Sequence, residues 1–272
     1  MLHPLISGNK FRKLKYNIIA AKESGRPILT FGGAYSNHIA ATAAAGKLHG
    51  VATIGVIRGE ELEHGPLNPT LDFARSQGMK LHFINRQTYR DKHLPSVLSL
   101  MQQRFGAFFH LPEGGTNEDA VRGCEEILGE ADFGFNYICC ACGTGGTLAG
   151  LSRKADENQR ILGFAASRDE SVGETIRKYS RKDNWTLLND FDFGGYGKVN
   201  PVLIDFINGF KSEYGVGLDP IYTGKMMFGV MSMLAEGYFE PGARILAVHT
   251  GGLQGIAGMN LRLKSSNLPL IE

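Results

Sequence analysis

Short apolar, β-branched runs alternate with longer amphipathic stretches along almost the whole chain. The runs predicted as strands cover residues 28–31, 53–57, 80–84, 108–111, 136–142, 161–165 and 244–249. The stretches predicted as helices cover residues 13–24, 37–49, 68–77, 94–105, 117–128, 147–154, 201–214 and 225–236. Parallel strands need a long crossover, usually a helix, so this alternation predicts an α/β fold with parallel strands in a three-layer arrangement. Nearly continuous apolar runs such as residues 244–249 indicate strands buried on both faces.

Two glycine-containing turns indicate where the chain divides. Gly32 to Ala34 and Pro112 to Gly115 bracket a block with about three strands and three helices. We therefore expect two domains: a small α/β domain over residues 35–112, inserted into a larger, discontinuous domain made of residues 1–34 and 113–272. Ligands often bind between domains, so a cleft between these two is the expected binding site.

Composition excludes several classes of partner. The 272 residues carry a net charge of +2 and no polybasic run, so neither nucleic acid nor an anionic membrane is an expected partner. No apolar run reaches the length of a membrane-spanning helix, and no secretory signal is visible. Cys139 and Cys140 should point to opposite faces of a strand. The cysteines lack zinc-like spacing to other ligands, so buried reduced thiols, no metal site and a cytoplasmic location are expected.

A glycine loop follows one of the predicted buried strands. Residues 137–150 read as a strand, then Gly-Thr-Gly-Gly from Gly143 to Gly146, then the start of a helix. Free backbone N–H groups at a helix N-terminus favour a phosphate, and glycine lets the backbone approach it closely. The Gly-Lys-Ser/Thr ending of a Walker loop is missing, and Leu148 stands where a dinucleotide fingerprint needs glycine. The loop therefore predicts a site for a single phosphate ester, with a tight turn lacking any ligand as the alternative.

Two lysines stand three residues apart near the beginning of the chain. Lys10 and Lys13 would share one face at the start of a helix. A nucleophilic lysine must lose its proton, which burial and a neighbouring cation favour. One of the two is therefore a candidate nucleophile and the other a candidate phosphate partner; an exposed basic helix start is the alternative.

Five motifs occur in an order that resembles a known enzyme family. They are Ser-Gly-Asn-Lys10-x-x-Lys13, Gly-Gly-Ala-Tyr-Ser36-Asn37-His38, Cys142-Gly-Thr-Gly-Gly-Thr147, Asp-Pro-Ile-Tyr222-Thr223-Gly-Lys225 and His249-Thr250-Gly-Gly252. Together they resemble the 1-aminocyclopropane-1-carboxylate (ACC) deaminase/D-cysteine desulfhydrase family. That family belongs to the fold type II, tryptophan synthase β-like enzymes that depend on pyridoxal 5′-phosphate (PLP). The resemblance extends from Ser7 to Gly252 and also implies a homodimer that acts on a small amino acid.

The resemblance implies a role for each matching residue. Lys10 would form the Schiff base with PLP and move the Cα proton. The remaining cofactor residues would be Lys13, Asn37, Cys142, Gly143, Thr144, Gly145, Gly146, Thr147, Thr223 and Thr250. Of these, Lys13 and the loop would bind the phosphate, Asn37 the phenolic oxygen and Thr250 the pyridine nitrogen. Ser36 would contact the substrate carboxylate and could assist proton transfer. Tyr222 would stack near the cofactor ring and act as an acid/base or positioning group, and Tyr196 matches a second active-site tyrosine more loosely.

Two threonines bear on the substrate. ACC deaminases of the family resemble one another in carrying Glu and Leu at the positions of Thr223 and Thr250, so the pair resembles the D-cysteine desulfhydrase branch. A threonine hydroxyl cannot keep the pyridine nitrogen protonated, which leaves a weaker electron sink suited to prompt β-elimination. The implied reaction is α,β-elimination of D-cysteine, or of a similar small D-amino acid, to pyruvate, sulfide and ammonia. ACC deamination and a non-catalytic PLP or amino-acid binding protein are the alternatives. His38 is expected to cap or pack its helix, and His249 is expected to be a core histidine rather than a base.

Overall fold

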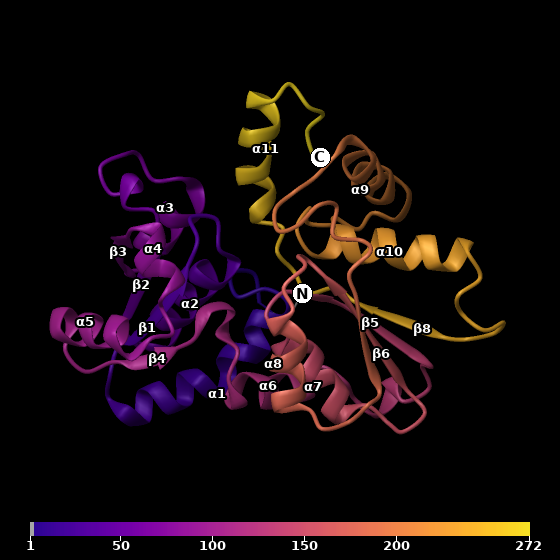
Figure 1. Cartoon of the computed structure of the whole chain (residues 1–272), viewed down its shortest axis with the longest axis horizontal. Helices are drawn as coiled ribbons and strands as arrows, with labels where there is room; N and C mark the ends of the chain where they lie inside the picture. Colours follow the sequence, from indigo (N-terminus) through magenta and orange to yellow (C-terminus); the bar gives the residue numbers. More distant parts are fainter. Residues whose placement is uncertain (1–2) are drawn as a thin grey trace. The chain divides into compact units, whose positions relative to one another are not determined.

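The computed structural model describes residues 3–272 and divides the chain into two compact units, Met1–Asp119 and Ala120–Glu272. Within the described residues, each unit contains one four-stranded sheet, and every strand pair is parallel (Figure 1). The α/β class with helix-covered parallel sheets is therefore confirmed. Within the same residues, no helix has both the length and the apolar character needed to cross a bilayer.

The first unit is built around the sheet β3-β2-β1-β4. Its elements are α1 (Asn9–Ser24), β1 (Ile28–Gly32), α2 (Asn37–His49), β2 (Thr53–Arg58), η1 (Glu60–Leu62), α3 (Pro69–Ser76), β3 (Lys80–Ile84), α4 (Arg86–Arg90), α5 (Pro95–Phe105), β4 (Phe109–Leu111) and η2 (Glu113–Gly115). In the register of the sheet, Ile28 of β1 pairs with Thr53 of β2 on one side and Phe109 of β4 on the other. All five residues of β1 are buried, as expected for a central strand covered by helices.

The second unit repeats this plan around the sheet β7-β6-β5-β8. Its elements are α6 (Glu118–Glu125, which begins at the end of the first unit), η3 (Glu130–Asp132), β5 (Tyr137–Cys142), α7 (Gly146–Lys154), β6 (Arg160–Ala165), α8 (Ser171–Tyr179), β7 (Trp185–Leu188), α9 (Pro201–Tyr214), α10 (Thr223–Ala235), β8 (Ile245–Val248) and α11 (Gly255–Ser265). All six residues of β5 are buried.

Both sheets reverse their strand order beside the first strand of the unit. From β1 the chain moves through β2 to β3 on one side and then returns to place β4 on the other side. From β5 it moves through β6 to β7 and then returns to place β8. In open parallel sheets, the loops at the carboxyl ends of the two strands flanking such a reversal diverge and leave room for a ligand. The fold therefore marks the ends of β1 and β4, and those of β5 and β8, as candidate sites.

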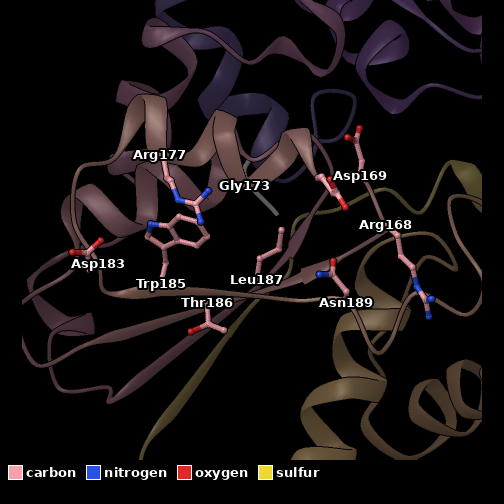
Figure 2. Close-up of a pocket in the computed structure, with 10 residues that line it drawn as sticks. Arg168, Asp169, Gly173, Arg177, Asp183, Trp185, Thr186, Leu187 and Asn189 are labelled. Carbon is pink, nitrogen blue, oxygen red and sulfur yellow. The ribbon is translucent and has the colours of Figure 1, made fainter.

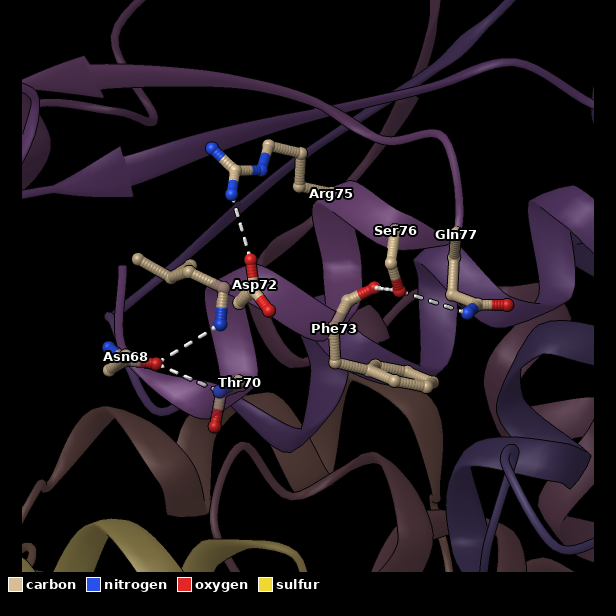
Figure 3. A network of polar contacts seen from close by, with 8 residues as sticks. Asn68, Thr70, Asp72, Phe73, Arg75, Ser76 and Gln77 are labelled. Carbon is tan, nitrogen blue, oxygen red and sulfur yellow. Dashed lines mark hydrogen bonds and ion pairs between the residues drawn. The ribbon is translucent and has the colours of Figure 1, made fainter. Parts of the chain in front are cut away.

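Helix starts follow from local capping chemistry. Figure 3 shows α3, where the Asn68 side chain accepts hydrogen bonds from the N–H groups of Thr70 (2.9 Å) and Leu71 (3.0 Å). Pro69 occupies the first helical position, where a missing N–H costs nothing. The same Asn-Pro pair begins α9, where Asn200 accepts from the Leu203 N–H at 2.9 Å. Such caps stabilise a helix by about 1 kcal/mol each.

The four cysteines are all free and buried, as the sequence predicts. Cys140 packs with α7 and α8 in one apolar cluster, whereas Cys139 packs with α10 in another. The prediction that they point to opposite faces of one strand is therefore confirmed. Burial raises the pKa of the Cys139 thiol to about 12 and raises that of Cys140 as well. Both residues are therefore protonated core residues at neutral pH.

Every predicted strand and helix has a counterpart in the structure, but three α-helices and one strand among the described residues were not predicted. The missing elements are α4, α8, β7 and α11. The prediction that residues 244–249 are buried on both faces is wrong, because β8 is an edge strand and all four of its residues are only half-buried. The sheet of the first unit also crosses the predicted boundary at residue 34, since β1 pairs with β2 and β4. The discontinuous domain division itself stays a prediction.

Packing between α6 and α7 yields a stability test. A Cβ on Gly150 would lie 2.5 Å from Cys124 Cβ and 2.7 Å from the Val121 carbonyl oxygen, and the backbone atom cannot move aside. We expect Gly150→Ala to lower the free energy of unfolding by about 1–3 kcal/mol, because overpacking outweighs the better helix propensity of alanine. Gly209 in α9 meets nothing within 4 Å, so Gly209→Ala should be stabilising by up to about 1 kcal/mol. Denaturant unfolding of both variants measures this difference, and equal effects would contradict it.

Candidate functional site

The end of β1 carries two of the predicted site residues into the start of α2. A Cβ on Gly32 would lie 2.4 Å from Ile39 Cγ1, so glycine is what allows the strand end to approach the first turn of the helix. Ser36 is the N-cap, and its hydroxyl accepts a hydrogen bond from the Ile39 N–H at 3.3 Å. Among the described residues, the buried Oδ1 of Asn37 finds no hydrogen-bond partner. A buried polar atom without a partner is costly, so this position suits a ligand that satisfies it.

Arg58 adds a positive charge to the same edge of the sheet, and the sequence reasoning missed it. It is the last residue of β2, next to β1, and its Nη2 lies 3.8 Å from the position that a Cβ of Gly33 would take. The guanidinium lies over the Tyr89 ring at 5.7 Å and is exposed. Arg58 could have been identified in the sequence as an arginine at the end of a predicted strand, near a glycine turn. A turn without side chains leaves room for an anion, which the guanidinium attracts.

The two lysines of α1 lie in different environments. Lys10 is half-buried, and its Nζ donates to Asn9 Oδ1 at 3.2 Å. Lys13 is only 3% exposed, and its Nζ donates to the Gly114 carbonyl and the Thr116 hydroxyl, both at 2.9 Å. Lys13 thus holds the turn that follows β4, a contact across about a hundred residues that the sequence did not reveal. Phosphate binding by Lys13 stays a prediction.

His38 is a buried neutral imidazole. Its Nε2 lies 2.8 Å from the hydroxyl of Thr30 on β1, and the side chain is 3% exposed. Burial lowers the pKa of His38 well below its ordinary value of 6.5, and the positive charges of Lys10 and Lys13 lower it further. The prediction that His38 packs against the fold is confirmed.

The glycine loop after β5 forms a cradle that side chains would fill. Gly145 is the N-cap of α7 with φ of 81°, and a Cβ there would lie 2.9 Å from Ile176 Cγ1. A Cβ on Gly143 would lie 3.1 Å from Tyr222 Cε1. No side chain caps α7, so its first turn presents backbone N–H groups to whatever occupies the loop. This donor set, at the positive end of a helix, fits the terminal phosphate of PLP.

The other predicted loop residues differ in exposure. Cys142 is buried at the end of β5, and Thr147 is buried in the first turn of α7, where its hydroxyl lies 3.9 Å from Cys124 Sγ. Thr144 is exposed at the tip of the loop. Gly146 is the first residue of α7. Backbone groups therefore provide most of what this loop can offer an anion.

Two tyrosines from distant segments meet at the glycine loop. The Tyr222 hydroxyl donates to the Tyr196 hydroxyl at 3.2 Å, and the two rings pack edge to face with centroids 6.1 Å apart. The Tyr222 ring also borders Gly143. Tyr196 is 55% exposed, which leaves its phenol accessible from solvent. The structure therefore brings the loop and both predicted tyrosines together at the carboxyl end of β5.

Asp219 fixes the start of α10, and the sequence reasoning missed this residue. Its carboxylate accepts hydrogen bonds from the N–H groups of Ile221, Tyr222 and Thr223 at 2.8–3.0 Å, and from the Thr223 hydroxyl at 2.8 Å. The same hydroxyl accepts from the Asp219 N–H at 2.8 Å, and Thr223 is fully buried. Thr223 thus belongs to the cap that orients Tyr222. An Asp shortly before a predicted helix start was the available signal.

The residues after β8 are more exposed than predicted. His249 is exposed, and its Nε2 lies 2.8 Å from the Gly217 carbonyl oxygen. The prediction of a core histidine is therefore wrong, and the cause is again the edge position of β8. Thr250 is half-buried in the turn that follows. It lies at the carboxyl end of the strand next to β5, where the fold marks a candidate site.

A groove of about 710 Å³ lies elsewhere in the second unit, beside α8 and β7 (Figure 2). Charged side chains line it, among them Arg168, Asp169, Arg177 and Asp183, and Arg177 lies over the Trp185 ring at 5.7 Å. None of the residues that line it belongs to the predicted site. Since β7 is the edge strand two places from β5, this groove is distinct from the glycine loop.

The fold and these switch-point residues define a PLP-dependent enzyme of fold type II. Residues 1–251 match the family model of pyridoxal-phosphate dependent enzymes, and the chain belongs to that family. A solved structure described as an ACC deaminase homologue superposes with a TM-score of 0.81 at 27% identity, covering 95% of this chain and 84% of its own. The processed form of threonine deaminase isoform 2 from Solanum lycopersicum shares the fold with a TM-score of 0.65 at 16% identity, covering 90% and 71% of the two chains.

Relatives place the chain within the ACC deaminase/D-cysteine desulfhydrase family, which confirms the resemblance. A Pyrococcus horikoshii protein provisionally named 1-aminocyclopropane-1-carboxylate deaminase is 31% identical over 92% of this chain and 81% of its own length. A bifunctional D-cysteine desulfhydrase/ACC deaminase of Arabidopsis thaliana is 26% identical over 92% and 70%. A D-cysteine desulfhydrase of Salmonella newport is 26% identical over 91% and 83%. The names show PLP-dependent elimination or deamination at the level of the family.

The buried histidine predicts how stability depends on pH. Because the folded-state pKa of His38 is depressed, the unfolded chain binds a proton that the folded chain does not as pH falls below 6.5. The free energy of unfolding should therefore decrease there, by at most about 1.4 kcal/mol per pH unit from this residue, and this loss should be absent above its unfolded pKa. We expect His38→Gln to show a shallower acid limb than the wild type in denaturant unfolding at a series of pH values. Parallel limbs would show that His38 is not the titrating group.

Proposed function

We propose that this chain catalyses PLP-dependent α,β-elimination on a small amino acid that carries a leaving group at Cβ, with D-cysteine as the preferred substrate. With one water, D-cysteine gives pyruvate, hydrogen sulfide and ammonia. The observation that carries the proposal is the Tyr222–Tyr196 pair packed against Gly143 of the glycine loop. It puts two phenols capable of proton transfer beside an anion cradle suited to one phosphate ester.

We infer which residues would contact the cofactor. The backbone N–H groups of Gly143 to Thr147 would hold the phosphate, and Asn37 would serve the phenolic oxygen through its side-chain N–H, because its Oδ1, buried without a partner in the described part of the chain, can only accept a hydrogen bond. Lys10 would hold the cofactor through its amine and would move the Cα proton. When bound, PLP supplies an electron sink that acidifies the Cα–H bond.

Each unit carries groups that suit one part of an amino-acid substrate. Ser36 and the N-terminus of α2 offer a hydroxyl and backbone N–H groups to the amino-acid carboxylate. Arg58, next to the Gly33 turn, adds the positive charge that favours an anionic substrate there. The Tyr222 hydroxyl, which donates to Tyr196, protonates the departing sulfur or returns a proton to the product.

Thr250 supports the choice of D-cysteine. The Thr250 hydroxyl would serve the pyridine nitrogen without holding it protonated, and the cofactor would then supply a weaker electron sink, which suits a substrate with a good leaving group. ACC has no such leaving group. ACC deamination is the second candidate, and the name of the 31% identical Pyrococcus horikoshii relative favours it. Retention of Lys10, Ser36 and Tyr222 argues against a binding protein without turnover.

Lys10 provides the direct test of the cofactor assignment. Wild-type protein with PLP should be yellow, and borohydride reduction followed by peptide mass spectrometry should find the cofactor fixed to Lys10. Lys10→Ala should lose both the visible absorption and the adduct, because no other amine takes its place. Lys22→Ala, an exposed lysine in the last turn of the same helix, should keep both. An adduct on any other lysine of the wild type would refute the assignment.

A substrate panel separates the two candidate reactions. D-cysteine should give keto acid and sulfide in equal amounts, faster than L-cysteine and ACC, because the proposed site suits prompt loss of a β-thiolate. Keto acid from ACC without a response to D-cysteine would establish the second candidate. No keto acid from any of the three would overturn the proposal of an eliminating enzyme.

A further inference from the structure

We propose that Lys225 is a positioning residue that holds Tyr196 against Tyr222 and so sets the geometry of the tyrosine pair. The inference rests on the proposed function only where it concerns turnover. Lys225 belongs to α10, three residues after Tyr222, and touches neither phenol by any contact that the structure shows. It acts through the loop of residues 192–197, which carries Tyr196.

The contacts of Lys225 are directed at that loop. Its Nζ donates to the Asp192 carbonyl oxygen at 2.7 Å and the Gly195 carbonyl oxygen at 2.8 Å, and more weakly to the Ala166 carbonyl oxygen at 3.4 Å. An ammonium has three N–H donors, so all three are engaged by backbone. The side chain is 1% exposed. The lysine thus ties the two ends of one loop turn to the segment after β6.

The loop needs such an anchor because its backbone is held in uncommon conformations. Phe193, Gly194, Gly195 and Gly197 have φ of 52°, 89°, 117° and 67°. Positive φ at a non-glycine residue such as Phe193 persists only where the surroundings impose it. Internal bonds contribute, since Asp192 Oδ1 accepts from the Gly194 N–H at 3.0 Å. Tyr196 follows Gly195 directly, so a fixed Gly195 carbonyl fixes the start of the Tyr196 backbone.

The same helix turn fixes the other phenol. Asp219 caps α10 and accepts from the Tyr222 N–H at 3.0 Å, which sets the backbone of Tyr222 relative to Lys225. One rigid turn therefore locates Tyr222 through its own backbone and Tyr196 through the lysine, and the two hydroxyls end 3.2 Å apart. Without the ammonium, the loop that carries the exposed Tyr196 would lose these two hydrogen bonds to α10.

Electrostatics explain why a charged group is retained in this position. Burial lowers the pKa of Lys225 to about 8, while the carboxylates of Asp192 and Asp219 raise it. Asp192 also pairs with the exposed Arg168 at 3.2 Å. At neutral pH Lys225 is therefore still mostly protonated, with three donors for three carbonyls. An apolar residue would fill the same space without the cost of burying a charge. The hydrogen bonds of Lys225 to the loop, and not its packing in the core, therefore account for a lysine at this position.

A double-mutant cycle tests the coupling in the holoenzyme. Tyr196→Phe should lower kcat for elimination by at least about tenfold with a small change in KM, as expected for loss of a group that assists proton transfer. Lys225→Met should lower kcat by a similar factor, and the double variant should be no slower than either single one. Multiplied losses in the double variant would show that the two residues act independently and would overturn the inference. Lys211→Met, an exposed lysine in α9, should leave kcat unchanged.

A second measurement does not depend on turnover. Trypsin should cleave after the exposed Lys198 much faster in PLP-loaded Lys225→Met than in the wild type or Lys211→Met, because the loop loses its anchor. Unchanged cleavage would overturn the inference even if no substrate were turned over, whereas a wild type without turnover would overturn only the proposed function. Where Lys225→Met fails to fold, Gly195→Ala disturbs the loop from its other end, since φ of 117° disfavours alanine. It should give the same loss in kcat and the same trypsin sensitivity.

Discussion

Parallel strands can be joined only by crossovers, and a chain that reverses the direction of its crossovers leaves an opening where the strand order changes. That constraint acts twice in this molecule, beside β1 and beside β5. The predicted site residues follow these two strands and the strands next to them, β4 and β8. Ser36 and Asn37 follow β1, and the turn held by Lys13 follows β4. The glycine loop follows β5, and Thr250 follows β8.

Glycine residues at these strand ends leave the space that a side chain would otherwise fill. At Gly32 the strand and the next helix approach so closely that any Cβ would collide with Ile39. At Gly143 and Gly145 the missing side chains give room to the Tyr222 ring and to Ile176 respectively. The loop is thereby both narrow and lined by backbone, which is the combination that selects a small anion over a nucleotide base.

Buried strands and periodic helices could be predicted from the sequence because each carries its own signal within a few residues. The elements that escaped prediction carry a shorter one. Helix α8 has Val172 and Ile176 at helical spacing, but it is only nine residues long and contains Gly173, and β7 is four residues long beside a charged stretch. The half-buried state of β8 was also beyond reach, because an apolar run does not say whether a strand ends at a sheet edge.

The residues of the candidate site likewise fall into those that the sequence reveals and those that it does not. Motif residues such as Lys10 and Tyr222 stand out by resemblance and by residue type. The residues that hold them in place do not, because their partners are far away in sequence: Lys13 reaches Gly114, and Lys225 reaches Asp192. Contacts over such separations exist only once the sheets have formed. Positioning residues are therefore the part of a site that sequence reasoning is least able to find.

The Asp219 cap changes the argument about the substrate. The family resemblance implies that ACC deaminases carry glutamate at the position of Thr223. This suggests that a single exchange of threonine for glutamate separates D-cysteine elimination from ACC deamination. Here the Thr223 side chain is fully buried and hydrogen-bonded in both directions to Asp219. A glutamate in its place would bring a second carboxylate against Asp219 in a buried position, where like charges repel strongly and at least one must bind a proton. The start of α10, and with it Tyr222, would have to be rebuilt. Threonine at this position is therefore part of how the tyrosine is held, and a glutamate there would require a different cap.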